Sequence, residues 1–127
     1  MTALILDAGA LIAIDSNDRA TFAKLKVALK FEMELRTTGV IIAQVWRDSN
    51  ARQANLAPMR NAVDVRAVDS KLGREAGILL GKARLSDPAG ATVVAVENTG
   101  DRILSSDSHD IGRLAAVSDR TVMVIPC

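Results

Sequence analysis

Three aspartates stand where a predicted strand ends or a predicted helix begins. Asp7 follows the apolar run Leu4-Ile5-Leu6, and Asp107 follows a second short strand pattern at 102–104. If these strands are neighbours in a parallel sheet, both carboxylates open at the edge of the sheet where ligands usually bind. Carboxylates placed together raise each other's pKa, and a divalent cation removes that cost. Mg²⁺ prefers one or two carboxylates with waters and substrate phosphates, and Asp87, which opens the preceding helix, offers a further oxygen ligand.

A simpler explanation exists for each of these aspartates. Asp is a favoured N-cap, and Asp7, Asp87 and Asp107 all precede a predicted helix. Ser105 and Ser106, just before Asp107, either hydrogen-bond the site or simply end the strand. The pattern therefore predicts a metal site, with three ordinary helix caps as the alternative.

The sequence lacks the residues that several other kinds of site need. It contains no GxGxxG, GxxxxGK[ST], HExxH or GxSxG motif. The lone His109 cannot build a histidine-based zinc site. The single cysteine, Cys127, excludes both a CxxC pair and a disulfide within the chain. Carboxylates therefore remain the chief chemical resource.

Length and composition limit the classes of protein to which the chain belongs. The 127 residues, 49% hydrophobic and 24% charged, predict one globular domain over residues 1–127. Aromatic residues make up only 2%, which excludes a domain that stacks bases on a row of rings. The start lacks a basic n-region, and no apolar run approaches the ~18 residues of a membrane span, so we expect a cytoplasmic protein without a membrane partner.

Strand and helix patterns alternate along the whole chain. Strands are predicted at 4–6, 38–42, 63–68, 102–104 and 121–125, and helices at 10–14, 19–35, 43–60, 69–83, 86–100 and 107–116. Such alternation with short connections predicts an α/β three-layer sandwich on a mostly parallel sheet of about five strands.

Three segments carry a resemblance to a known family: LILDAGALIAID, VIIAQVWR and LSDPAGATVVAVENTGDRILSSDSHDIGRLAA. In them the chain resembles PIN domains, most closely the VapC-type toxins of actinobacterial toxin–antitoxin pairs. The resemblance implies a PIN-like fold and a Mg²⁺- or Mn²⁺-dependent endoribonuclease that acts as the toxin of a type II pair. It also implies an RNA substrate, a homodimer, and an acidic groove that a cognate antitoxin blocks.

The family's acidic positions are only partly matched here. Asp7 matches the first metal-binding Asp, and Asp107 matches the late Asp after the fourth strand. The usual Glu on the helix after the second strand falls at Gln44, and the usual Asp inside the later helix falls at Gly90. Asp87 matches an earlier acid of that helix opening, one turn before Gly90.

By this resemblance Asp7 and Asp107 hold the metal ion. Asp87 or Asp110 completes the ligand set, or orients the attacking water and accepts its proton. Asp110, three residues after Asp107, fits a capping turn or a group behind the ligands better than a ligand.

Two other function classes remain beside the ribonuclease. Gln44 and Gly90 favour a catalytically degenerate PIN-like protein that binds an antitoxin or RNA without cleaving. A receiver-like phosphoacceptor domain would need an acidic pair after the first strand and a late Lys after a strand, and the sequence has neither.

A basic stretch accompanies the acidic positions. Residues 19–60 contain eight Lys and Arg against three acids. The basic side chains Lys24, Lys26, Lys30, Arg47, Arg52 and Arg60 either contact phosphates beside the acidic site or form ordinary solvated helix faces.

Overall fold

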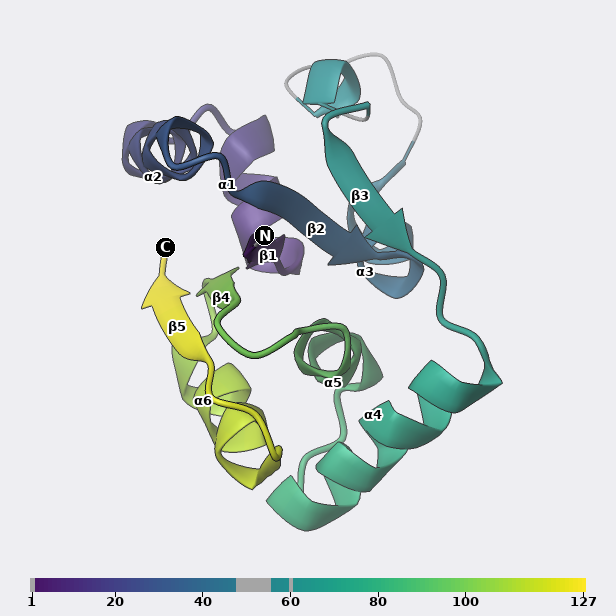
Figure 1. The fold of residues 1–127 in the computed structure, drawn as a ribbon. Helices are drawn as coiled ribbons and strands as arrows, with labels where there is room; N and C mark the ends of the chain where they lie inside the picture. Colours follow the sequence, from purple (N-terminus) through teal and green to yellow (C-terminus); the bar gives the residue numbers. More distant parts are fainter. Residues whose placement is uncertain (1, 48–55, 60) are drawn as a thin grey trace.

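The fold is centred on a parallel sheet, seen in a computed structural model that describes residues 2–47, 56–59 and 61–127 (Figure 1). Its five strands are β1 (Ala3–Leu6), β2 (Glu34–Thr38), β3 (Val63–Arg66), β4 (Arg102–Ser105) and β5 (Met123–Pro126). They lie in the order β3-β2-β1-β4-β5, and every neighbouring pair is parallel. All four residues of the central strand β1 are buried, as a continuous apolar run requires.

Helices cover both faces of this sheet. One face carries α1 (Ala8–Asp15), α2 (Arg19–Lys30) and α3 (Gly39–Val45), and the other carries α4 (Ser70–Ala83), α5 (Pro88–Ala95) and α6 (Ser108–Val117). A short 3-10 helix, Ala57–Met59, precedes β3. The predicted three-layer α/β sandwich with a parallel sheet is confirmed. None of the helices in the described ranges is long and apolar enough to span a bilayer.

The second strand was predicted in the wrong place. The β-branched run after Thr38 predicted a strand over 38–42, whereas β2 ends at Thr38 and the next residues form α3. Thr38 is the N-cap of that helix, and its hydroxyl accepts a hydrogen bond from the Ile41 backbone N–H at 3.3 Å. The cap and the packing of α3 therefore outweigh the strand preference of the β-branched side chains.

Other helix boundaries also differ from the prediction. The helix predicted over 19–35 ends at Lys30, and Glu32 adopts a positive φ of 57° where the chain turns toward β2. The helix that opens at Asp87 ends at Ala95 instead of 100. Of the helix predicted over 43–60, residues 48–55 and 60 lie outside the described residues.

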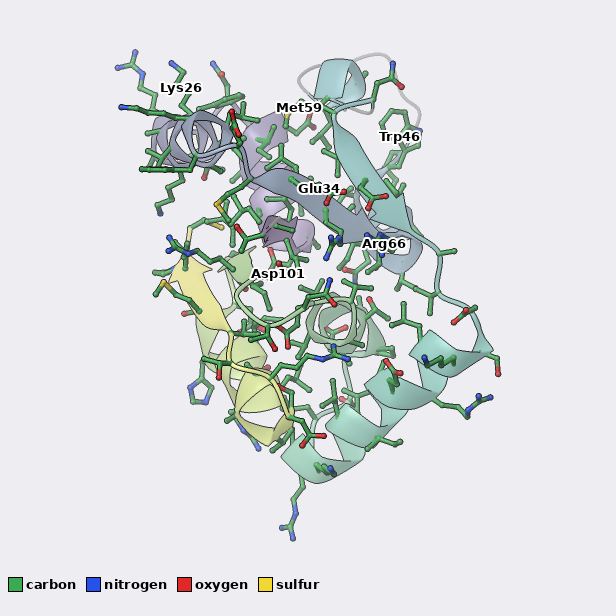
Figure 2. The ribbon with its side chains drawn as sticks, viewed as in Figure 1. Lys26, Glu34, Trp46, Met59, Arg66 and Asp101 are labelled. Atoms are coloured by element: carbon green, nitrogen blue, oxygen red, sulfur yellow. The ribbon has the colours of Figure 1, made fainter. Side chains whose placement is uncertain are left out.

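A buried arginine organises the polar side of β2. Arg36 is 3% exposed, and its guanidinium lies 3.1 Å from an Asp101 carboxylate oxygen and 3.3 Å from Glu34. It also donates to the Val96 carbonyl at 3.3 Å, which ties β2 to the end of α5. Asp101, itself buried, accepts further hydrogen bonds from the backbone N–H groups of Ala3 and Asn98. Two of the Arg36 partners, Glu34 and Asp101, are labelled near the middle of the molecule in Figure 2.

A second buried acid lies close to this cluster and lacks such partners. Glu97 is 1% exposed, and neither of its carboxyl oxygens has a hydrogen-bond partner. Burial raises the pKa of Glu97 to about 7, although the nearby positive charge of Arg120 lowers it and the negative charge of Asp101 raises it further. The folded protein therefore holds a proton on Glu97 at pH values where the unfolded chain has released it.

Replacing Glu97 by Gln is expected to remove a pH dependence of stability. Because the folded-state pKa lies above the ordinary value of 4.5, the stability present at low pH is lost as pH rises toward 7 and above. From pH 5 to pH 8 the wild type should lose about 2 to 3 kcal/mol relative to Glu97→Gln. Urea unfolding of both proteins at the two pH values measures this difference, and parallel pH profiles would contradict it.

Candidate active site

Asp7 lies at the carboxyl end of the central strand, where the chain turns from β1 into α1. It is 6% exposed, and its two carboxylate oxygens have different partners. Oδ1 accepts a hydrogen bond from the Ala10 backbone N–H at 2.8 Å and so caps α1, while Oδ2 accepts the Ser105 hydroxyl at 2.5 Å. The backbone N–H of Asp7 also donates to the Leu104 carbonyl at 3.3 Å. Asp7 is thus both a helix cap and a link between β1 and β4.

Ser105 connects the two ends of the site. Its hydroxyl donates to Asp7 and accepts the Asp107 backbone N–H at 2.9 Å, although 98 residues separate Ser105 from Asp7 in sequence. The β1–β4 pairing, with Leu6 opposite Leu104, makes this contact possible. Of the two explanations for Ser105, the structure supports the one in which it hydrogen-bonds the site.

Asp107 differs from Asp7 in its exposure and in the use of its side chain. It occupies the N-cap position of α6, but its side chain makes no capping hydrogen bond, and it is exposed. Of the two explanations for Asp107, a metal ligand or an ordinary cap, the structure does not support the cap for its side chain. An exposed carboxylate that does not cap its own helix is available to a ligand.

The charge of Asp107 acts on the buried carboxyl of Asp7. Burial raises the pKa of the Asp7 carboxyl, whereas hydrogen bonds from Ser105 and from the backbone N–H groups of Ala10 and Ser106 lower it. The negative charge of Asp107 raises the Asp7 pKa further, as expected for carboxylates that share a site. A cation at this edge of the sheet would reverse both unfavourable effects.

Asp87 fills the space beside Gly90. Its Oδ1 accepts the Ala89 backbone N–H at 3.1 Å, so it caps α5, and Pro88 follows at the first helical position, where its missing N–H costs least. A Cβ added to Gly90 would lie 3.2 Å from Asp87 Oδ2 and 3.4 Å from Ile111 Cδ1. The Asp87 carboxylate therefore lies where a side chain at position 90 would extend.

The remaining candidates lie on two different helices. Asp110 is half-buried in the first turn of α6, three residues after Asp107. Gln44 is exposed in the last turn of α3. Of these acids, Asp107 is the one whose negative charge is a named cause of the raised Asp7 pKa.

The carboxylates at this edge of the sheet are few for a metal site. Within the described ranges, no group of three or more His, Cys, Asp or Glu side chains is arranged to hold a metal ion. Asp7 and Asp107 alone match the smaller set that Mg²⁺ uses in proteins, in which waters and substrate phosphates complete the coordination. The chemistry of these oxygens fits a single hard cation.

Gly9 lets α1 approach the β4 turn closely, a requirement that sequence reasoning missed. A Cβ on Gly9 would lie 1.6 Å from Ser106 Oγ and 2.4 Å from Ser106 Cβ. A new hydroxyl rotamer cannot relieve the second contact, because the Ser106 Cβ is fixed by the backbone. The signal in the sequence is a Gly two residues after the Asp at the strand end.

Gly9→Ala is expected to destabilise the protein by about 1 to 3 kcal/mol, because the added methyl must push α1 away from Ser106. Urea unfolding measures the effect. Gly73→Ala on α4 is the matched control, since nothing lies within 4 Å of its added Cβ, and it should stabilise by about 0.5 to 1 kcal/mol. Adding Ser106→Gly to Gly9→Ala should restore stability, and failure to do so would show that the clash lies elsewhere.

Comparison with known proteins adds a structural relative. No protein-family model and no curated protein matches this chain. A solved structure described as the crystal structure of VapBC2 from Rickettsia felis bound to a DNA fragment from their promoter contains a chain similar in fold. The match has a TM-score of 0.71 and covers 98% of this chain and 99% of that chain, at 11% sequence identity. This chain therefore has a PIN-like α/β fold, shared with a chain of a toxin–antitoxin complex.

Proposed function

We propose that this protein is a metal-dependent endoribonuclease and acts in the cytoplasm as the toxin of a type II toxin–antitoxin pair. One observation carries the proposal: Ser105 joins Asp7 and the Asp107 backbone, at the carboxyl ends of two adjacent parallel strands. Ligands bind at this edge in open α/β sheets. The fold shared with a VapBC2 chain supports a cognate antitoxin as partner. RNA as substrate and a homodimer as the assembly rest on the sequence resemblance.

Asp7 and Asp107 would hold the cation in this proposal. A bound Mg²⁺ or Mn²⁺ supplies an acidified water and neutralises negative charge on the phosphoryl oxygens. Ser105 keeps the Asp7 carboxylate in one orientation through its hydroxyl. Asp87 or Asp110 orients the attacking water and accepts its proton. The Asp87 carboxylate beside Gly90 supports Asp87 for the role of the missing acid.

A second candidate function is a PIN-like protein that binds an antitoxin or RNA without cleaving. The observation that favours it is the absence, among the described residues, of a metal-ligand group of three or more. Gln44 carries a neutral amide and Gly90 has no side chain, so neither position adds a negative charge that would hold a cation. Both residues therefore support the same alternative.

Metal-dependent cleavage separates these two functions. Purified protein is incubated with a labelled single-stranded RNA pool in EDTA, in Mg²⁺ and in Mn²⁺, and an Asp7→Asn preparation made in parallel controls for contaminating ribonuclease. We expect fragments with either metal, none in EDTA, and recovery when excess Mg²⁺ is added. Cleavage that persists in EDTA would contradict a metal-dependent enzyme.

Calorimetric titration of Mg²⁺ and Mn²⁺ tests the site itself. The ribonuclease proposal predicts that the wild type binds about one ion. If the wild type binds neither metal and Gly90→Asp gains binding, the degenerate protein is favoured. The carboxylate introduced by Gly90→Asp would lie close to that of Asp87. Because Asp87 is exposed, its side chain has room to move away.

A further inference from the structure

Lys24 ties α2 to the end of β5, next to the candidate active site. Its ammonium donates to the Pro126 carbonyl at 2.6 Å. Pro126 lies opposite Ser105 in the β4–β5 pairing, and the next residue, Cys127, donates its backbone N–H to the Ser105 carbonyl at 2.9 Å. Lys24 is therefore anchored one strand away from the serine that holds Asp7. In the ribbon the C-terminus lies beside α2 (Figure 1).

The charges of Lys24 and Asp7 act on the same neighbour. Burial raises the pKa of the Cys127 thiol, the Asp7 carboxylate raises it further, and the Lys24 ammonium lowers it. The Lys24 charge also lowers the pKa of Asp18, whose carboxylate is occupied by hydrogen bonds from Thr21. The Lys24 ammonium therefore lies near the edge of the acidic site, since its charge and that of Asp7 both act on the Cys127 thiol.

The Lys24 ammonium has capacity for another partner. It carries three N–H donors, and the Pro126 carbonyl takes one of them. Lys26, another cation of α2, does not share this position. Lys26 follows two residues later, about 200° around the helix, and its side chain points away from the C-terminus (Figure 2). Lys26 therefore provides a matched control for Lys24.

We propose that Lys24 binds a phosphate of the RNA strand, adjacent to the phosphate that a cation on Asp7 and Asp107 would hold. This inference rests on the proposed ribonuclease function and adds a substrate contact to it. The acidic site repels an RNA backbone when no cation is bound, so a fixed ammonium beside it offsets that repulsion. The anchor on Pro126 holds the ammonium near the site and reduces the side-chain entropy that RNA binding would cost.

RNA binding measured without hydrolysis tests this role. The wild type, Lys24→Gln and Lys26→Gln are titrated into a short fluorescein-labelled single-stranded RNA in EDTA, over about 50 to 200 mM salt. Loss of one phosphate contact should weaken binding roughly fivefold at low salt and reduce the salt slope by about 0.7. We expect this for Lys24→Gln alone, and Lys24→Arg should restore affinity because it keeps the charge. If Lys24 served only to hold α2 to β5 through the Pro126 carbonyl, Lys24→Gln would lower the free energy of unfolding and leave the salt slope of RNA binding unchanged.

The outcomes separate this inference from the proposed hydrolysis. Equal salt slopes for Lys24→Gln and the wild type, or an equal loss in Lys26→Gln, would overturn the role of Lys24. Absence of RNA binding by the wild type at low salt would overturn it as well. Weaker binding by Lys24→Gln together with an inactive wild type in Mg²⁺ would support Lys24 as an RNA contact and reject the hydrolysis.

Discussion

Asp7→Asn is expected to reduce metal-dependent RNA cleavage at least about 100-fold, since even the loss of a group behind a metal ligand costs 10- to 100-fold. The amide keeps one oxygen, which can still accept the Ala10 N–H and cap α1. It removes the negative charge that would hold the cation. The rate of fragment formation in Mg²⁺ measures the effect.

The fold should survive this substitution. Burial raises the pKa of Asp7, so a neutral amide is easier to bury than the carboxylate. The amide nitrogen, however, cannot accept the buried Ser105 hydroxyl as Oδ2 does. Since these two effects oppose each other, thermal unfolding is expected to show a midpoint close to that of the wild type. Asp119→Asn is the matched control, because it makes the same charge change at an exposed position in the turn before β5. Wild-type cleavage by Asp7→Asn would remove Asp7 from the site.

Arg36→Met is expected to destabilise the protein by about 3 to 5 kcal/mol, because removing one partner leaves a buried charge uncompensated. Asp101 would keep its two backbone donors, from Ala3 and Asn98, but would lose its cation. Urea unfolding at neutral pH measures the loss. Adding Asp101→Asn to Arg36→Met should recover part of it, since it removes the orphaned charge, but one amide oxygen can accept only one of the two backbone donors, which bind different Asp101 oxygens.

Arg66→Met is the control for the Arg36 experiment. Arg66 pairs with Asp64 at 2.6 Å, but its side chain is 46% exposed. Exposed ion pairs contribute about 0 to 1 kcal/mol, so this variant should differ little from the wild type. Equal effects of the two arginine substitutions would show that burial does not decide the strength of these pairs.

Local signals in the sequence predicted the elements well where capping chemistry decides the outcome. Asp69 and Asp87 cap α4 and α5, which begin within two residues of the starts predicted for those helices at 69 and 86. The prediction of the second strand over 38–42 was wrong, because Thr38 can either continue a strand or cap a helix, and only packing decides between the two. Arg36 was also beyond prediction, since its partners come from β2, β3 and the turn before β4.

The candidate site was predictable in part. The positions of Asp7 and Asp107 at strand ends follow from the alternation of strands and helices, and the structure places those strands side by side. The part played by Ser105 required the register of that pairing, which no local pattern contains. The close approach of Gly9 to Ser106 likewise depends on two segments far apart in the chain.

The long separation between Asp7 and Ser105 also has a consequence during synthesis. β1 leaves the ribosome before its neighbour β4, and the serine that orients Asp7 follows Asp7 by 98 residues. Pairings between such distant segments form late, because closing a long loop costs chain entropy before the contact forms. A nascent chain that ends before β4 has no assembled site. If the protein is the ribonuclease proposed above, it therefore cannot cleave RNA until β4 has been made and has paired with β1.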